Sequence, residues 1–249
     1  MTGMDPRSVI HATARKINDI GAAFYFAPET LERGRQVGLD GFRFYFIGRG
    51  GVLGDVEAGV IRAAFGYWEP GLVDKMWNTA KEKVPPREGA RLYLGCNHDF
   101  GRATLGDVEG LEGFVDAAST VIAAVEGTSL PLFEAVRCEP VPDDVPAAAM
   151  HQAMVLRELR GSVHLLALTA CRLDSRHAHG IKRPDEFKLF GYNSEIEVTE
   201  TDRARWLRAE ELTDEILVMS FGRLTDVQSK ALIMGVEAMH ERVVDPGGD

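Results

Sequence analysis

The sequence predicts an all-α protein with at most a short β-ribbon. Stretches in which apolar residues recur at helical spacing alternate with prolines, glycines and helix-capping residues along the chain. Residues 42–47 form a short aromatic run bounded by glycines, where we expect a strand or a buried irregular segment. A single run of this kind cannot form a sheet, so the pattern favours a helical fold class.

The first half of the chain contains five predicted helices. In the first of them Ile10, Ala14 and Ile17 share one face, and Pro28 suits the first turn of the second. The five predicted helices span residues 9–26, 29–37, 56–65, 70–81 and 113–126.

Residues 56–65 and 70–81, joined by a tight connection around Gly66, have the outline of a helix-turn-helix unit. A recognition helix would present base-reading and phosphate-binding side chains. Residues 70–81 instead mix acids and bases, and we expect a packing unit more than a DNA reader. Tyr67 and Trp68, in the connection, are predicted to be core or pocket aromatics.

Asn97, His98, Asp99 and Arg102 form a polar cluster that the sequence places in a glycine-rich turn between apolar runs. Loops carry binding residues more often than helices do. Asn and Asp are also ordinary turn formers, so a purely structural role is the alternative. Asn97 and His98 are candidate ligand-binding residues.

Residues 137–149 hold three prolines and are predicted to form an extended connector. This connector would divide the chain into an N-terminal helical half, residues 1–136, and a C-terminal helical half, residues 150–249. The halves are weakly similar at an offset of 145 residues, with Phe42 matching Phe187. An internal duplication of this kind would place a cleft between the halves.

Residues 150–179, predicted to be one long helix with an exit loop, hold four of the seven histidines. At about 100° per residue, Arg157, Arg160 and His164 lie on one arc, beside an apolar stripe. His151 and Glu158 lie on a third arc. The stretch thus places a titratable ring and two fixed positive charges beside an apolar wall, which could bind a small acid. The alternative is a solvated helix face with weak ion pairs.

Gly161 interrupts this predicted helix, where glycine costs about 1 kcal/mol relative to alanine. We therefore expect a close packing neighbour or a bend at this position. Further helices are predicted near 185–191, from Thr199 through Trp206, and at 210–221 and 226–243.

The net charge of −10, from 28 Lys and Arg against 38 Asp and Glu, opposes binding to nucleic acids and to anionic membranes. No apolar run is long enough for a membrane span, and the N-terminus has no apolar core of a signal peptide. The three cysteines are widely spaced, which argues against a disulfide framework and fits a reducing compartment. We expect a cytoplasmic protein with no membrane partner.

The known catalytic and cofactor-binding motifs are absent from the sequence. The glycines of 48–54 depart from the dinucleotide-binding pattern at Leu53, so a turn before a helix is favoured. His177 and His179, with Asp174 nearby, could hold a metal only with a third ligand from elsewhere. Solvated loop histidines are the simpler account, so no metal site is predicted, and the cofactor is left unknown.

The stretch AMHQAMVLRELRGSVHLLAL, residues 149–168, resembles the hallmark helix of an actinobacterial family labelled SalK-like or EvbL-like and described as helix-turn-helix proteins. Similar stretches elsewhere are AAFGYWEPGLVDKMW, GRATLGDVEGL, LPLFEAV and GRLTDVQSKALIMGVE. The resemblance implies no activity, but it strengthens His164, Arg160 and Glu158 as site candidates. The polar and basic loop 177–184 departs from the family pattern.

The leading hypothesis is that the protein binds, or binds and transforms, a small organic anion in an aromatic-lined cleft. Arg160 would pair with a carboxylate or phosphate, His164 would act as donor, acceptor or general acid/base, and Glu158 would orient a neighbour. His164 is the candidate catalytic residue, and whether the protein is an enzyme is left open. The other candidate ligand-binding residues are Arg157, His151, Tyr67, Trp68, Asn97 and His98.

Two alternatives come from other classes of protein. One is a transcriptional regulator that binds DNA or protein through residues 56–81, although the negative charge argues against nucleic acid. The other is a structural partner in a homo-oligomer, for which exposed aromatics such as Trp68 or Tyr192 would be the sign.

Overall fold

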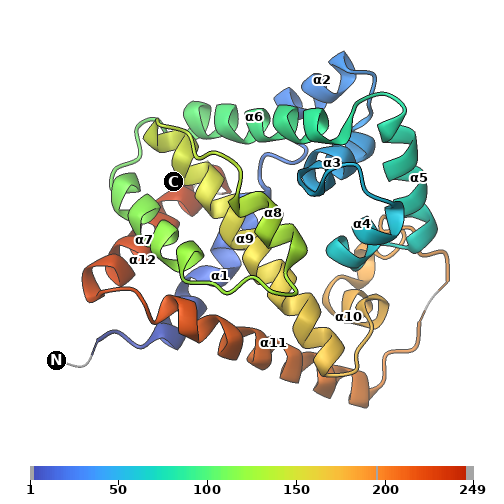
Figure 1. The fold of residues 1–249 in the computed structure, drawn as a ribbon. Coiled ribbons are helices and arrows are strands. Elements are labelled where there is room, and N and C mark those ends of the chain that lie inside the picture. The colour runs from blue at the N-terminus through green and yellow to red at the C-terminus, as the bar shows by residue number, and fades with distance from the viewer. Residues whose placement is uncertain (1–2, 195, 245–249) are drawn as a thin grey trace.

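The computed structural model describes residues 3–194 and 196–244, and within these ranges every regular element is a helix (Figure 1). The predicted all-α class is therefore confirmed. The α-helices are α1 (Pro6–Ala22), α2 (Pro28–Gln36), α3 (Gly41–Gly50), α4 (Ala58–Phe65), α5 (Pro70–Lys81), α6 (Pro86–Leu105), α7 (Leu111–Ala123), α8 (Pro131–Arg137), α9 (Val145–Ala170), α10 (Ser175–Lys182), α11 (Glu200–Phe221) and α12 (Asp226–Val243). Two short 3₁₀ helices are η1 (Gly51–Leu53) and η2 (Pro184–Glu186).

Helix α9 is the central element, and Figure 1 shows it crossing the middle of the molecule. It packs against α1, α6, α7, α8 and α11. Most of its residues from Ala147 to Leu159 are buried on every side, as expected for a helix surrounded by others. A single large core runs from Val9 to Met239 and includes residues from both sides of the proline-containing segment 137–149. A smaller core under α10 contains Ala167, Leu173 and Ala209.

Capping side chains explain where many helices begin. An Asp, Glu or Thr precedes the first turn and accepts a backbone N–H, which satisfies a donor that has no partner within the helix. Both α11 and α12 start with a complete capping box, headed by Thr199 and Thr225. Helix α12 accordingly begins and ends where the sequence predicts.

The aromatic run 42–47 is helical, so the expectation of a strand or an irregular segment there was wrong. Asp40 caps α3 by accepting the backbone N–H of Arg43. Phe44, Tyr45, Phe46 and Ile47 are all buried. A helix that is buried all around shows no apolar stripe, so its periodicity cannot be seen in the sequence.

The polar cluster Asn97–Arg102 lies inside α6, so the predicted glycine-rich turn was also wrong. At Gly101, inside this helix, α9 lies too close to leave room for a side chain. A Cβ at this position would lie 2.6 Å from the carbonyl oxygen of Pro146. The glycine lets α6 approach α9 closely, and it is not a turn signal.

The C-terminal half differs from the prediction in four places. Helix α9 starts at Val145, within the predicted connector. The expected exit loop around His177 and His179 is helix α10, which Asp174 caps by accepting the backbone N–H of His177. Residues 200–221 form one continuous helix, not two. The expected helix near 185–191 is reduced to η2 and turns. Phe42, by contrast, lies in a full helix, so the similar segments around Phe42 and Phe187 have different conformations.

The close packing neighbour expected at Gly161 is absent among the described residues. α9 continues through it, and a Cβ added there would meet no atom within 4 Å. The glycine faces open space, which is the cavity described below.

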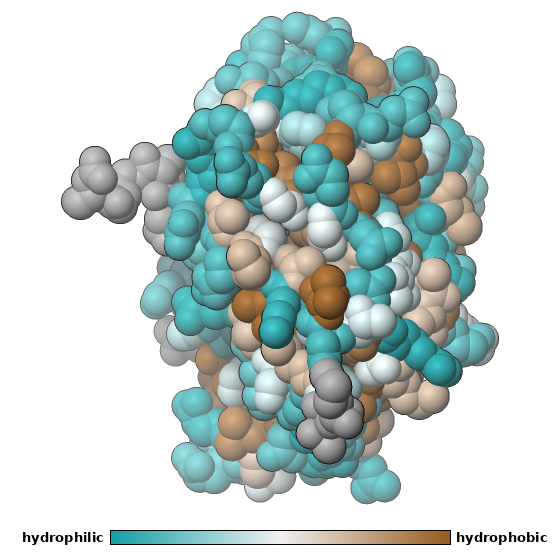
Figure 2. Space-filling model, turned by 90° about the vertical axis from the view of Figure 1, so that its left-hand side faces the viewer, coloured by the Kyte–Doolittle hydropathy of each residue, from teal (hydrophilic) through white to brown (hydrophobic). Residues whose placement is uncertain are grey.

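None of the helices in the described ranges is long and apolar enough to cross a membrane. The face over α7 and α12 has apolar side chains interspersed with hydrophilic ones (Figure 2). Trp68 and Tyr192 do not form an exposed aromatic patch, because Trp68 stacks on Phe190 and Tyr192 is buried.

Candidate functional site

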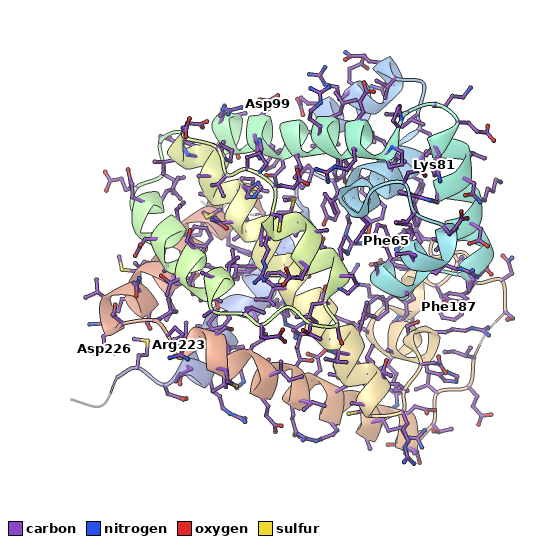
Figure 3. All side chains as sticks on the ribbon, in the orientation of Figure 1. Phe65, Lys81, Asp99, Phe187, Arg223 and Asp226 are labelled. Atoms are coloured by element: carbon purple, nitrogen blue, oxygen red, sulfur yellow. The ribbon has the colours of Figure 1, made fainter. Side chains whose placement is uncertain are left out.

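A cavity of about 140 Å³ lies where α3, α4, α9 and α10 meet. In Figure 3, Phe65 of α4 and Phe187 lie on the side of the molecule where α4 and α10 meet. Aromatic rings and basic side chains make up most of the wall. The residues that line it are Asn18, Tyr45, Arg49, Ala64, Phe65, Tyr67, Trp68, Arg157, Glu158, Arg160, Gly161, Ser162, His164, Leu165, His179, Lys182, Arg183 and Phe190.

The six candidates Arg157, Glu158, Arg160, His164, Tyr67 and Trp68 therefore line one cavity. The first four come from two turns of α9, where Arg157, Arg160 and His164 share one arc and Glu158 lies on another arc that also lines the cavity. Tyr67 and Trp68 come from the α4–α5 connection. The sequence thus identified residues from two segments, about 90 positions apart, that the fold brings together.

The α4–α5 connection has an unusual backbone. Gly66 and Tyr67 both have positive φ angles, 57° and 52°. Glycine adopts this conformation readily, whereas a tyrosine pays on the order of 1–3 kcal/mol for it. A side chain at Gly66 would also collide with Leu165 of α9, so the connection lies directly on that helix. This turn directs Tyr67 and Trp68 into the cavity wall, and burial raises the pKa of Tyr67.

Glu158 is the most completely paired charge in the wall. Both of its oxygens accept hydrogen bonds from Arg49, at 2.7 and 2.8 Å. Oε1 also accepts from Arg157 Nη1 and from the Tyr25 hydroxyl, both at 3.0 Å. Burial alone would raise the pKa of Glu158, but the adjacent Arg49 and Arg157 charges and these hydrogen bonds lower it to about 2. Glu158 is therefore ionised at neutral pH.

Arg49 was not among the sequence candidates. It comes from α3, 109 residues before Glu158, and its guanidinium lies 4.2 Å from the ring centre of Phe65. An arginine within an otherwise buried aromatic run was the available signal, because such a charge requires a buried partner. Because a strand or an irregular segment was expected in this run, the place of Arg49 on a buried helix could not be predicted.

Glu210 of α11 forms a second cluster of charges. It accepts a hydrogen bond from Arg160 Nη2 at 2.6 Å, and its Oε1 lies 4.0 Å from Lys182 Nζ. Burial raises the pKa of Glu210, but His164, Arg160 and Lys182 have the larger combined effect and lower it. Neither Glu210 nor Lys182 could be assigned from spacing, since they come from two other helices.

The two clusters together are not neutral. Four cations, Arg49, Arg157, Arg160 and Lys182, face two carboxylates, Glu158 and Glu210, which leaves an excess of two positive charges. Arg183, also in the wall, is paired at the surface with Glu186. This local excess occurs in a chain whose net charge is −10.

His164 is buried, with 3% of its surface exposed. Its Nδ1 lies 2.8 Å from the Thr213 hydroxyl, and Nε2 lies 3.5 Å from Glu210 Oε1. Burial lowers the pKa of His164 to about 4, against the opposing effect of Glu210. The ring is therefore neutral at pH 7.

Several polar atoms of the wall lack a hydrogen-bond partner. Within the described part of the chain, eight buried side-chain nitrogen or oxygen atoms have none, and four of them belong to residues of this cavity. They are Arg157 Nε, Arg160 Nε, His164 Nε2 and His179 Nε2. Because buried polar groups are nearly always paired, this concentration is informative.

The remaining three candidates lie elsewhere. His151 and His98 pack together where α9 crosses α6, with His98 Nε2 and His151 Nδ1 3.1 Å apart. Asn97, beside them, donates to the carbonyl oxygen of Met150 at 3.4 Å. None of these three side chains lines the cavity.

The histidines of α10 have separate surroundings. His177 contacts the Asp174 carboxylate at 2.8 Å, whereas His179 is buried and packs against Phe190, with ring centres 4.0 Å apart and the ring planes tilted by 36°. Across residues 3–194 and 196–244, no group of three or more His, Cys, Asp or Glu side chains is arranged to hold a metal ion.

The α4–α5 unit has the order of a helix-turn-helix, and its outer charges are largely paired within the chain. Lys81 of α5 forms an ion pair with Asp55, and Arg62 of α4 lies 3.3 Å from Asp74. Trp77 is fully buried and donates to the carbonyl oxygen of Val56. The unit is thus packed into the protein core along one side of α5.

Comparison with known proteins relates the chain to a described family. A model of a helix-turn-helix family matches residues 10–193, which is more than half of the chain. Neither the curated proteins nor the solved structures include a match to this chain. The family match supports the helix-turn-helix part of the regulator alternative more than it supports anion binding. By its sequence, this chain belongs to a helix-turn-helix family.

Proposed function

We propose that this helix-turn-helix family protein binds a small organic anion in the cavity beside α9. The observation that carries the proposal is the excess of two positive charges in the wall. Burying a cation without a counter-charge is costly, and a bound anion supplies the missing negative charge. Arg160 and Arg157, each with an unpartnered Nε, would donate to its oxygens.

The size of the cavity limits the anion. An engineered protein cavity of about 150 Å³ binds benzene. A cavity of about 140 Å³ therefore suits a molecule with one ring or a few carbon atoms, and it is too small for a nucleotide. The aromatic wall formed by Tyr67, Trp68, Phe65 and Phe190 supports a planar apolar body attached to the anionic group.

His164 would have the role of proton acceptor in this site. It is neutral, buried and in the wall, and its Nε2 has no hydrogen-bond partner. If the protein transforms its ligand, this nitrogen is the candidate general base.

Isothermal titration calorimetry at pH 7 with benzoate, propionate and inorganic phosphate would test the proposal, together with native mass spectrometry of freshly purified protein. We expect benzoate or propionate to bind, and Arg160→Met to weaken that binding at least about 10-fold, because hydrogen bonds to charged groups contribute about 1.5–3 kcal/mol. Arg208→Met, on an exposed arginine of α11, is the matched control and should bind normally.

A second variant tests the location of the ligand. Gly161→Phe projects a ring into open space in the cavity while leaving every charged residue in place, and it should abolish binding. Unchanged affinity in both Arg160→Met and Gly161→Phe would contradict the proposal. So would the absence of binding by all three anions in a protein that co-purifies with none.

A second candidate function is that of a regulator that binds DNA or protein through α4 and α5. Membership of a helix-turn-helix family supports it. From the resemblance of residues 149–168 we also propose the narrower SalK-like or EvbL-like assignment, which implies no activity of its own. The ion pairs of Lys81 and Arg62 and the acidic net charge weigh against DNA. Duplex binding that falls steeply with salt, and that Lys75→Glu weakens, would favour this candidate.

A further inference from the structure

The hydrogen bonds around His164 determine which ring nitrogen carries the proton. The Thr213 hydroxyl donates its only hydrogen to the carbonyl oxygen of Ala209, at 2.7 Å. It can therefore only accept from His164 Nδ1, 2.8 Å away, and Nδ1 must carry the proton. In the neutral ring, Nε2 is then an acceptor with a free lone pair.

A second acceptor lies close to this nitrogen. Nε2 lies 3.5 Å from Glu210 Oε1 and has no hydrogen-bond partner. The pKa values of both groups are lowered, that of His164 by burial and that of Glu210 by His164 and its two cationic neighbours against the opposing effect of burial. At neutral pH no proton is shared between them, so both need a donor from outside the pair.

The neighbouring cations do not meet this need. Arg160 donates through Nη2 to Glu210 Oε2, which is the other carboxylate oxygen. Lys182 Nζ is 4.0 Å from Oε1, beyond hydrogen-bonding distance. The protein thus surrounds a buried acceptor, His164 Nε2, with a site that lacks one hydrogen-bond donor.

We infer that the ligand is a hydroxy acid of about the size of one ring, whose hydroxyl group donates a hydrogen bond to His164 Nε2 while its carboxylate lies against Arg157 and Arg160. This inference rests on the proposed function and specifies the ligand class. It uses both kinds of unpartnered atom in the wall, since the arginine Nε atoms require an acceptor and His164 requires a donor. A site built to pair a ligand hydroxyl discriminates strongly against the analogue that lacks it.

Calorimetric titration with benzoate, the three isomers of hydroxybenzoate and the three corresponding methoxybenzoates tests the inference. We expect at least one hydroxybenzoate to bind at least about 10-fold more tightly than benzoate, a difference of about 1.4 kcal/mol. Its methoxy counterpart, which has no donor, should lose that advantage. In His164→Phe the ratio of hydroxybenzoate affinity to benzoate affinity should fall below about 2-fold.

A second variant is needed in case His164→Phe does not fold. Thr213→Val removes the acceptor that fixes the Nδ1 proton, so the ring is free to carry its proton on Nε2, and the preference for hydroxybenzoate should disappear. The ¹⁵N spectrum of labelled protein provides a readout of the ring itself. Adding the preferred hydroxybenzoate should shift the signal of the unprotonated His164 nitrogen upfield, and benzoate should not.

The outcomes separate this inference from the proposed function. Equal affinities for benzoate and all three hydroxybenzoates would overturn the hydroxy-acid inference and leave anion binding intact. A hydroxyl preference that persists in both His164→Phe and Thr213→Val would overturn it as well. If neither benzoate nor any hydroxybenzoate binds, and propionate and phosphate do not bind either, the proposed function fails and the inference fails with it.

Discussion

His151 and His164 lie on the same helix and have similar burial, and yet their surroundings differ. Each has at most 3% of its surface exposed, and burial lowers the pKa of each to about 4. His151 shares a hydrogen bond with His98, and one proton between two neutral rings satisfies that contact. His164 has Thr213 on one side and an unsatisfied nitrogen on the other.

Charge separates the two regions further. The fixed charges near His98 are at the surface, where Arg102 pairs with Asp99 and Asp144. Around His164 the charges lie in or beside the wall of the cavity, and the cations Arg160 and Lys182 outnumber the one carboxylate, Glu210. A buried histidine with a shifted pKa is therefore an ordinary feature of this protein, and the unbalanced, unsatisfied surroundings are what make His164 the candidate site residue of the two.

The largest loss of stability is expected for Glu158→Leu, in the region of the cavity. This variant leaves Arg49 and Arg157 buried without a counter-charge, and breaking a buried ion pair costs about 3–5 kcal/mol. Urea unfolding at pH 7 would measure the loss. Glu215→Leu, on the exposed partner of Arg208, is the control and should change stability little. A loss in Glu158→Leu as small as that of the control would mean that the cavity cations do not depend on this carboxylate.

The second effect is a loss of stability in mild acid that both regions share. A histidine whose pKa falls from 6.5 in the unfolded chain to about 4 in the folded protein stabilises the fold fully above pH 6.5, and the contribution is lost as the pH falls toward 4. Lowering the pH from 7 to 5 should cost about 2 kcal/mol for each of the two histidines. His151→Leu and His164→Leu should each make the urea midpoint less dependent on pH, by the equivalent of about 2 kcal/mol between pH 7 and pH 5.

The binding experiment then distinguishes the two histidines. Saturating benzoate should raise the pKa of His164, because an added negative charge favours the imidazolium. It should leave the pKa of His151 unchanged, since that ring lies outside the cavity. Equal shifts of the two pKa values in an NMR titration would show that the anion does not bind beside His164.

A third prediction concerns the glycine near His98. Gly101→Ala should destabilise the protein by about 1–3 kcal/mol, because the new methyl group would lie 2.6 Å from the carbonyl oxygen of Pro146 and α6 would have to move away from α9. Thermal unfolding provides the measurement. A variant as stable as the original protein would mean that the two helices are not in close contact at this point.

The smallest effect is expected for the glycine in the cavity wall. Gly161→Ala should stabilise the protein by about 0.5–1 kcal/mol, since a Cβ meets nothing within 4 Å and alanine favours the helix. The two substitutions are chemically identical and should have opposite signs. If both destabilise the protein, the open space beside Gly161 is not available to a side chain.

The sequence predicts helices well where a cap or an apolar stripe exists. Helix α12 begins at the Thr225 capping box and α5 at a proline, and both are predicted with their observed bounds. Helix α3 could not be predicted, because a helix that is buried on all sides has no apolar stripe in its sequence. Helix α6 was obscured by Gly101, whose role depends on a helix more than forty residues away.

The candidate site shows the same division between local and long-range information. Arg157, Arg160 and His164 could be grouped from the sequence because helical spacing alone places them on one arc. Their partners Arg49 and Glu210 could not, since they are 109 and 50 residues distant from Glu158 and Arg160 along the chain. Spacing also could not show that His151, only thirteen positions before His164, faces a different helix.

The stack of Trp68 on Phe190 places a fluorescent indole in the cavity wall. Its ring centres are 4.0 Å apart, and both residues line the cavity. Trp77 is fully buried in the main core, and Trp206 packs against the smaller core. A ligand that enters would therefore change the emission of one indole among three, so occupancy could be followed by intrinsic fluorescence without a label.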